Sequence, residues 1–187
     1  MNKTVTLTTQ RLILRQWNDS DLPIFAEINA DPAVMKYYHS TLSENESNAM
    51  AGKLKALITE RSWGFWAVET KKENEFIGFV GLHKPAYDLP VTPCIEIGWR
   101  LGKKHWGKGY ATEAAFQALN FAFEELKLNE IYSFTSLVNK QSWSVMKRLK
   151  MKNLERNFNH PIIQKDHIFS EHVLYKITAE QWESKSI

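Results

Sequence analysis

Cysteine is almost absent from the sequence. Cys94 is the only cysteine among 187 residues. One thiol cannot form an intramolecular disulfide, and it cannot supply a zinc site that depends on several cysteines. This usage fits a reducing compartment, so we expect the protein to be cytoplasmic.

Long apolar runs and a large excess of one charge are absent as well. No stretch approaches the roughly 18 consecutive apolar residues of a membrane span, and the N-terminal residues lack the apolar segment of a secretory signal. The formal net charge is only +3 and the charges are scattered, whereas a nucleic-acid surface needs clustered basic residues. We therefore expect neither a membrane nor a nucleic-acid partner.

The sequence does contain enough apolar material for one core. Hydrophobic residues make up 43% of the chain, which is long enough for one well-buried domain and short for two. We expect a single domain over residues 1–187, with its core at about residues 7–177. No internal repeat, linker or low-complexity segment stands out.

Hydrophobic patterning and turn residues predict the order of the elements. A helix should begin at the capping residues 18–21 and end at the break at Asp31 and Pro32. Ser43 followed by Glu46 is a capping-box pattern for a second helix to about residue 60. Strands are expected at residues 6–15, 63–69, 76–82, 96–101, 130–137, 154–159 and 168–177, and a further helix at 141–151. This order describes a mixed sheet with helices on both sides.

The stretch at residues 94–125 organises the rest of the chain. A strand enters a glycine-containing loop, and the loop opens directly onto an amphipathic helix. The apolar or small positions of that helix are Ala111, Ala115, Ala118, Leu119, Ala122 and Leu126. Glycines let a ligand approach the backbone, and the first amides and the dipole of a helix favour negative charge. The stretch therefore predicts a phosphate site.

Two common phosphate loops fit this stretch badly. Residues 102–108 match G-x-x-x-x-G-K, but Gly109 follows where a P-loop nucleotidase needs a Ser or Thr to hold magnesium. A dinucleotide fingerprint would need a third glycine at Thr112 and an early βαβ unit.

A third interpretation comes from a family resemblance. The segment WGKGYATEA, preceded by EIGWRL, resembles the acetyl-CoA pyrophosphate loop of the GNAT superfamily of N-acetyltransferases, whose pattern is Gln/Arg-x-x-Gly-x-Gly/Ala. Gly109 and Ala111 occupy the two small positions, while Trp106 stands where the family usually has Gln or Arg. That departure is familiar in the ribosomal-protein N-terminal acetyltransferase-like (RimJ/RimL-type) branch, which the N-terminal TQRLILR followed by DSD also resembles.

A second block of residues supports this resemblance. Asn139, Ser142, Val145, Met146 and Leu149 are similar in spacing to the branch's N-x-x-S-x-x-V-x-x-K-L-G-F. The resemblance covers about residues 7–175. It implies an α/β, GNAT-like fold with a mixed, mostly antiparallel sheet of about seven strands flanked by about four helices.

The sequence departs from the branch at the end of this block. Lys150 and Met151 stand where the branch usually has Gly-Phe, so the glycine that would end the helix is missing. Asn153 is the residue that we expect to supply the left-handed conformation instead.

The resemblance also implies the cofactor residues. The strand at Trp99, Arg100 and Leu101 would splay from its neighbour and bind the pantetheine arm of acetyl-CoA. Asn139 would bind a pantetheine amide or act as a local helix cap. The amides of the glycine loop would hold the pyrophosphate, unless the loop is an ordinary turn; its residues are Trp106, Gly107, Lys108, Gly109, Tyr110, Ala111 and Thr112.

Candidate catalytic residues follow from the same resemblance. Glu96 is the candidate general base or a solvated or ion-paired glutamate, and His83 is the alternative base. Met146 stands where many GNAT enzymes carry a tyrosine acid. Ser142 is therefore a candidate general acid, with helix capping or cofactor binding as the alternative. Three residues, Tyr37, Tyr38 and His39, are candidates for the acceptor side.

The function that these patterns predict is direct acetyl transfer from acetyl-CoA to a primary amine of a peptide or small molecule. The alternative is a non-catalytic CoA-binding module of the same fold. No metal is expected, because the C-terminal histidines match no zinc pattern. We expect a monomer or a homodimer, and the acceptor is left open.

Overall fold

The chain forms two compact units in a computed structural model that describes residues 4–184. The first unit contains residues 4–82 and 98–118, and the second contains residues 83–97 and 119–184. The extreme ends of the predicted domain, residues 1–3 and 185–187, lie outside the described residues. Each unit is described by itself.

The first unit is built on antiparallel strands. In hydrogen-bonded order they are β1 (Leu7–Thr8), β2 (Leu12–Arg15), β3 (Phe65–Thr70) and β4 (Phe76–His83), followed by the end of β5 (Glu96–Leu101). The predicted hairpin of β3 and β4 is confirmed. The single strand expected at residues 6–15 is wrong, because the chain reverses between β1 and β2. The Thr9 hydroxyl accepts a hydrogen bond from the Leu12 amide at 2.9 Å and closes this turn.

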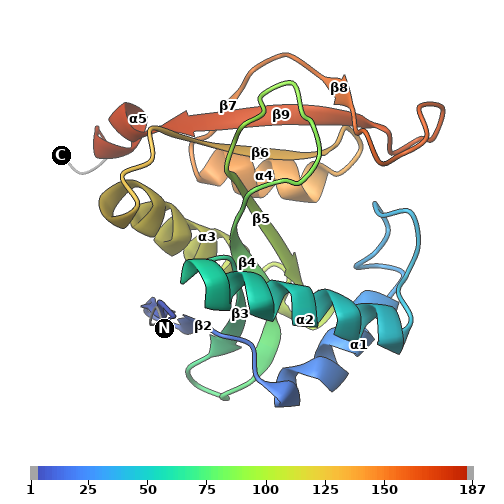
Figure 1. Ribbon diagram of the computed structural model, residues 1–187, viewed down its shortest axis with the longest axis vertical. Coiled ribbons are helices and arrows are strands. Elements are labelled where there is room, and N and C mark those ends of the chain that lie inside the picture. The colour runs from blue at the N-terminus through green and yellow to red at the C-terminus, as the bar shows by residue number, and fades with distance from the viewer. Residues whose placement is uncertain (1–3, 185–187) are drawn as a thin grey trace. The chain divides into compact units, whose positions relative to one another are not determined.

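Two helices accompany these strands. A 3₁₀ turn (Asp19–Asp21) leads into α1 (Leu22–Ala30), and α2 (Glu44–Arg61) lies beside α1 (Figure 1). The predicted capping box is present at α2: Ser43 accepts from the Glu46 amide, and Glu46 accepts from the Ser43 amide. Apolar side chains from both helices and from the strands form the core, including Phe25, Ile58 and Trp66.

The second unit has β6 (Glu130–Ser136) and β9 (Glu171–Thr178) as its long antiparallel pair. The short strands β7 (Lys152–Asn153) and β8 (Phe158–Asn159) pair with β9. The start of β5 pairs in parallel with β6, and α4 (Lys140–Arg148) lies along β6 (Figure 1). A mixed, mostly antiparallel sheet is therefore confirmed. The structure adds the five-residue helix α5 (Ala179–Glu183), so the described residues contain five α-helices.

Helix α3 (Tyr110–Asn120) follows the glycine loop as predicted. A short 3₁₀ turn (Lys103–His105) precedes the loop, and α3 continues into a π-helical turn (Phe121–Glu125). Ala115, Ala118, Leu119 and Ala122 of the predicted apolar face are all fully or nearly fully buried. The small alanines allow the helix to pack closely.

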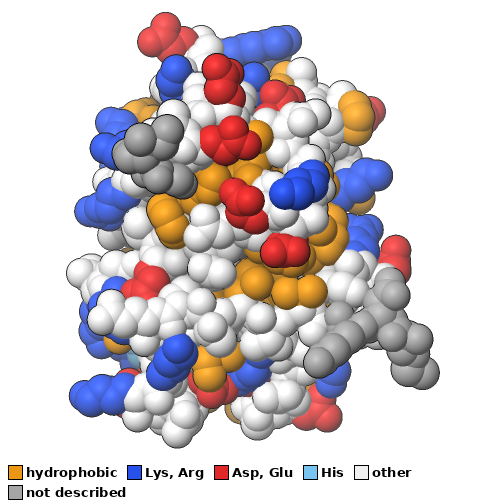
Figure 2. Space-filling model, turned by 90° about the vertical axis from the view of Figure 1, so that its left-hand side faces the viewer, with side chains coloured by type: hydrophobic (Ala, Val, Ile, Leu, Met, Phe, Trp, Pro, Cys, Tyr) orange, Lys and Arg blue, Asp and Glu red, His pale blue; other side chains and the backbone are white. Residues whose placement is uncertain are grey.

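Charged side chains of both signs lie on the surface. The face in Figure 2 shows acidic and basic side chains around exposed apolar ones. Ion pairs also form within each unit: Arg15 contacts the buried Asp21 and also Glu69, each at 2.7 Å, and Lys176 contacts Glu130 at 3.2 Å.

The end of α4 corrects one expectation. Lys150 itself adopts the left-handed conformation, with φ +61°, whereas Asn153 lies in β7. The amides of Lys150 and Met151 turn back onto the carbonyls of Lys147 and Met146. This closing geometry requires positive φ directly after the last helical turn, so a residue three positions later cannot supply it.

The left-handed lysine gives a stability prediction. Replacing Lys150 with Gly should raise the free energy of unfolding by up to about 1 kcal/mol, because glycine adopts positive φ without a Cβ clash. Chemical denaturation measures the change. The matched control is Lys147→Gly inside the same helix, which should lower stability by about 1 kcal/mol. Equal destabilisation by both substitutions would contradict the assignment.

Candidate functional site

The glycine loop has the geometry of an anion cradle. Gly107 and Gly109 adopt φ of +73° and +81°, and α3 begins at Tyr110. A Cβ at Gly107 would meet nothing within 4 Å, so this side of the loop is open. The first amides of α3 have no intrahelical acceptor, and the helix dipole adds positive potential there. The loop can therefore hold a negatively charged group.

Trp106 fixes the loop to the strand that precedes it. Its indole Nε1 donates a hydrogen bond of 2.8 Å to the carbonyl oxygen of Leu101, the last residue of β5. The residue that departs from the family pattern thus has a structural role. It sets where the loop leaves β5.

Arg11 is a contributor that sequence reasoning missed. Its Nη1 donates to the Lys108 carbonyl at 3.0 Å, its Nε donates to Glu113 Oε2 at 2.6 Å, and its guanidinium lies 4.7 Å from the centre of the Tyr110 ring. A Cβ placed on Gly109 would lie 3.4 Å from Arg11 Nη2. The guanidinium therefore supports the loop from the β1–β2 turn.

Glu113 is held as a charged partner of Arg11. Burial opposes its charge, but hydrogen bonds from the Thr9 hydroxyl (2.6 Å) and from Arg11 lower the pKa of this carboxyl overall. One local signal was visible in the sequence, namely an acidic residue in the first turn of a helix. Its partners lie over 100 positions away in the chain, so local patterning could not identify them.

The strand β5 also supplies Arg100, whose side chain is buried and points to α1. Its Nη1 donates to Asn29 Oδ1 at 2.6 Å, and Tyr38 stacks on the guanidinium at 4.3 Å. Two residues predicted on separate grounds, Arg100 and Tyr38, are therefore in contact. Tyr37 and His39 flank Tyr38 in the segment between α1 and α2.

In the second unit, Glu96 is a half-buried carboxyl at the start of β5. Burial raises the pKa of Glu96 to about 8. The nearby Tyr87 and Cys94 also have raised pKa values, in both cases mainly through burial and then through the charge of Glu96; that of Cys94 reaches about 11. Glu96 is thus poised to exchange a proton near neutral pH.

Asn139 and Ser142 are in contact at the start of α4. Asn139 is the N-cap: its Oδ1 accepts from the Ser142 amide at 3.3 Å, and its Nδ2 donates to the Ser142 and Thr135 hydroxyls at 3.2 and 3.0 Å. Asn139 therefore caps α4, which is one of the two roles expected from the sequence. Because Ser142 Oγ accepts this bond, its own proton can be donated to another group.

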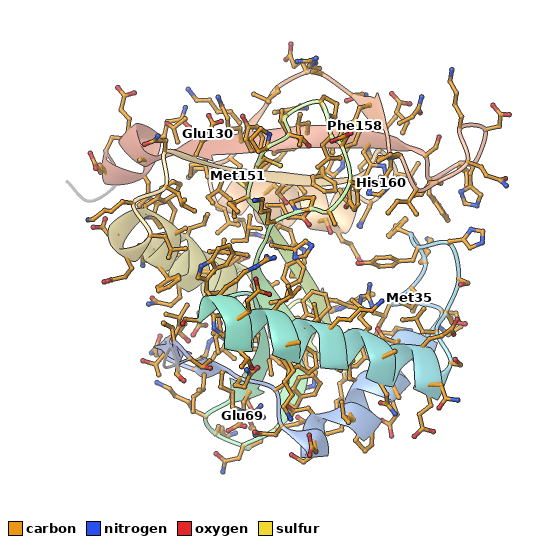
Figure 3. All side chains as sticks on the ribbon, viewed as in Figure 1. Met35, Glu69, Glu130, Met151, Phe158 and His160 are labelled. Carbon is orange, nitrogen blue, oxygen red and sulfur yellow. The ribbon has the colours of Figure 1, made fainter. Side chains whose placement is uncertain are left out.

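A histidine cluster lies at one end of the long strands of this unit. His160 Nε2 is 3.2 Å from the Tyr87 hydroxyl, and the rings of His160 and His172 are 4.8 Å apart. Figure 3 shows Phe158 and His160 at this end and Glu130 at the other. Burial, followed by the charge of His172, lowers the pKa of His160 to about 4. His160 is therefore neutral at pH 7, and burial lowers the pKa of His172 as well. Residues 4–184 contain no group of three His, Cys, Asp or Glu side chains that could hold a metal ion.

The predicted residues thus divide between the units. Within the first, the loop at residues 106–112 is contacted by Arg11, and Arg100 contacts Tyr38. Within the second, Asn139 contacts Ser142, and the charge of Glu96 contributes to the raised pKa of Tyr87. His83 is the last residue of β4.

The fold is mixed α/β, and its glycine loop precedes a helix N-terminus whose geometry suits an anion. Residues 11–152 match the Acetyltransferase (GNAT) domain family. The chain is 32% identical over 184 residues to FsC-acetyl coenzyme A-N(2)-transacetylase of Aspergillus fumigatus, covering 95% of this chain and 77% of that protein. The chain therefore belongs to the GNAT acetyltransferase family, and it is an N-acetyltransferase.

Solved structures agree with this assignment. A GNAT-family acetyltransferase from Bacillus anthracis is 26% identical, with a TM-score of 0.78 and coverage of 94% of this chain and 99% of that one. The RimL ribosomal L7/L12 alpha-N-protein acetyltransferase, solved in complex with coenzyme A, shares the fold at 14% identity, with a TM-score of 0.73 and coverage of 95% and 99%. The GNAT resemblance is confirmed, and RimL shares the fold of this chain. Within residues 4–184, no helix has the length and apolar character to span a membrane.

The raised pKa of Glu96 gives a prediction about stability. The ordinary value of 4.5 applies in the unfolded chain, whereas the folded chain keeps the proton up to about pH 8. Between these values the unfolded state binds fewer protons, so the free energy of unfolding should fall as the pH rises from 5 to 8. Glu96→Gln should remove this fall in denaturation series at several pH values. Exposed Glu155→Gln is the control and should leave the fall unchanged. Parallel curves for wild type and Glu96→Gln would refute the shift.

Proposed function

We propose that this protein transfers the acetyl group of acetyl-CoA directly to a primary amine, without an acyl-enzyme. The observation that carries the proposal is the loop at residues 106–112, with its two left-handed glycines before α3 and Arg11 against it. An open backbone cradle with a helix dipole fits a pyrophosphate. Lys108 supplies a further cation in the same loop.

The resemblance to the family implies which residues would bind the rest of the cofactor. When bound, acetyl-CoA supplies an acetyl group that is already activated as a thioester. The amides of Gly107 to Thr112 would hold its pyrophosphate, and the backbone of Trp99, Arg100 and Leu101 would bind the pantetheine arm. Asn139 stays a candidate for this arm, although its side chain is engaged as a helix cap.

The start of β5 supports the role of this strand as an aligner. Glu96 pairs with Tyr132 of β6, and the Tyr132 amide donates to the Ile95 carbonyl at 3.0 Å. The next β5 carbonyl that faces β6 is that of Ile97. It accepts a hydrogen bond of 3.0 Å from the Ser133 hydroxyl instead of from a backbone amide. The regular backbone ladder gives way there, as expected for a strand that leaves its neighbour.

Two residues of the second unit suit the required proton transfers. Glu96 would accept a proton from the incoming ammonium, directly or through water, because its pKa of about 8 allows both protonation states near neutral pH. His83 is the alternative base. Ser142 would donate a proton to the departing thiolate, because its oxygen already accepts from Asn139. The buried Met146 has no proton to give.

Direct transfer is favoured over a covalent enzyme intermediate by the state of Cys94. Burial raises the pKa of this thiol to about 11, so it is almost entirely protonated at pH 7. A nucleophilic cysteine is normally activated in the opposite direction. Attack by the acceptor amine on the bound thioester needs no such group.

The acceptor is proposed only as a class. The names of two similar proteins refer to a nitrogen of FsC and to the α-nitrogen of a ribosomal protein, and both are amines or amine-derived groups. A protein N-terminus or a small-molecule amine is thus our proposal. A single domain, a cytoplasmic location and a monomer or homodimer stay predictions.

The test is thiol release from acetyl-CoA across a panel of amino acids, polyamines, amino sugars and peptides with free N-termini. We expect turnover with at least one class, and Cys94→Ala should retain nearly all of it. Loss of turnover in a folded Cys94→Ala variant that still binds CoA would defeat direct transfer. Tight CoA binding without turnover of any amine would favour the non-catalytic alternative.

A substitution in the loop tests the cofactor assignment. Gly109→Asp strains a backbone with φ +81°, crowds Arg11 and adds a negative charge beside the proposed pyrophosphate. Calorimetric affinity for CoA should fall by about 100-fold or more. The control is Gly52→Asp, which adds the same charge at an exposed site of α2 with open space around it. Unchanged affinity in a folded Gly109→Asp protein would show that the loop is not the cradle.

A further inference from the structure

Arg100 is a buried cation without a counter-ion in the described part of the chain. Only 8% of its surface is exposed. Arg15, in the same unit, contacts two carboxylates, and Arg11 contacts one. No carboxylate of residues 4–184 forms an ion pair with Arg100; its polar contacts there are Asn29 Oδ1 and Met50 Sδ. Burying an unpaired charge is costly, so this arrangement needs an explanation.

Neutral groups hold the guanidinium in a fixed orientation. Asn29 is fully buried, and its Nδ2 donates to the buried Ser47 hydroxyl at 2.8 Å, which aims Oδ1 at Arg100 Nη1. Tyr38 and Phe79 lie 4.3 and 5.5 Å from the guanidinium carbon, measured to their ring centres. Three elements, α1, α2 and β5, thus fix the position of the charge and leave it unneutralised.

One edge of the guanidinium lacks a hydrogen-bond acceptor among residues 4–184. Nη1 is occupied by Asn29, whereas the buried Nε has no hydrogen-bond partner among the described residues. Nη2 likewise makes no hydrogen bond within residues 4–184. Nε and Nη2 together form the edge that binds a planar carboxylate through two parallel hydrogen bonds. Tyr38 beside this charge is 41% exposed, so the cluster reaches the surface of the unit at that ring.

We propose that Arg100 recognises a carboxylate on the acceptor, so that the substrate class is an amine that also carries a carboxylate group. The proposal rests on the proposed function and on the sequence-based prediction that Tyr37, Tyr38 and His39 lie on the acceptor side. Arg100 would position the acceptor through its side chain, while the same strand binds the cofactor through its backbone. A neutral amine would leave the buried cation unpaired and would bind more weakly.

The experiment compares free amino acids with their carboxamides as acceptors. For the wild-type protein we expect kcat/KM for the acid to exceed that for its amide by about 10-fold to 100-fold, which is the range for a charge-assisted pair. Arg100→Gln should bring this ratio close to one, because kcat/KM for the acid falls while that for the amide changes little. Exposed Arg148→Gln is the matched control and should keep the wild-type ratio.

A second variant separates recognition from structure. Asn29 Oδ1 lies 2.6 Å from Arg100 Nη1. Asn29→Asp places a carboxylate at this position, so it neutralises Arg100 while the side chain at position 29 keeps its shape. The variant should be at least as stable as wild type in thermal unfolding and should lose the preference for acids. If it gains stability and keeps the preference, or if Arg100→Gln slows acids and amides equally, Arg100 has only a structural role.

Binding distinguishes failure of this inference from failure of the proposed function. N-acetylated amino acids and their amides are titrated calorimetrically into the protein in the presence of CoA. Selective binding of the acids that Arg100→Gln abolishes supports the carboxylate site, even if no amine is turned over. Turnover of amines with no preference for acids in either assay overturns the inference and leaves the proposed function intact. Absence of both turnover and selective binding overturns both.

Discussion

The contact between Arg11 and Glu113 is the interaction on which the glycine loop at residues 106–112 depends. A carboxylate in the first turn of a helix stabilises that helix, yet beside an anion site it would repel the ligand. Arg11 resolves this conflict, because it neutralises Glu113 and at the same time holds the Lys108 carbonyl. Arg11 lies in the turn between β1 and β2, which the hydrogen bond between Thr9 and Leu12 closes. The turn that separates β1 from β2 therefore helps to hold the loop at residues 106–112.

Glu96 and Glu113 illustrate how surroundings assign different tasks to the same side chain. Both are withdrawn from water to some extent, and in both cases burial opposes the charge. Glu113 receives hydrogen bonds from Thr9 and Arg11, so its pKa falls and it remains a permanent anion. Among residues 4–184 no such donor to Glu96 is present, so burial raises its pKa to about 8. A structural carboxylate and a proton-exchanging one are thus separated by their hydrogen-bond donors and not by burial itself.

The features that the sequence predicted well are those whose cause is local. The capping box of Ser43 and Glu46 spans three positions, and the left-handed glycines precede their helix directly. Contacts between distant segments were not predictable, because one sequence contains no signal that joins Arg11 to Glu113. The positive φ of Lys150 was misplaced for another reason: the family pattern suggested a glycine, whereas the closing hydrogen bonds of α4 fix the position whatever residue is there. The roles of the candidate site residues stay predictions, since the residues divide between two units.

Arg15 and Arg100 lie in the same unit but have different partners, and this difference supports a functional interpretation of Arg100. Asp21 and Glu69 both contact Arg15, which shows that this unit can provide carboxylates to an arginine on a strand. The hydrogen-bond partner of Arg100 is instead Asn29, whose side chain has the shape of aspartate but no charge. An aspartate there would satisfy the cation internally and would remove its attraction for any external anion. Retaining a neutral partner, oriented by Ser47, keeps the charge in place and available. This is the arrangement expected when the missing anion belongs to a substrate, and it is costly when the arginine serves packing alone.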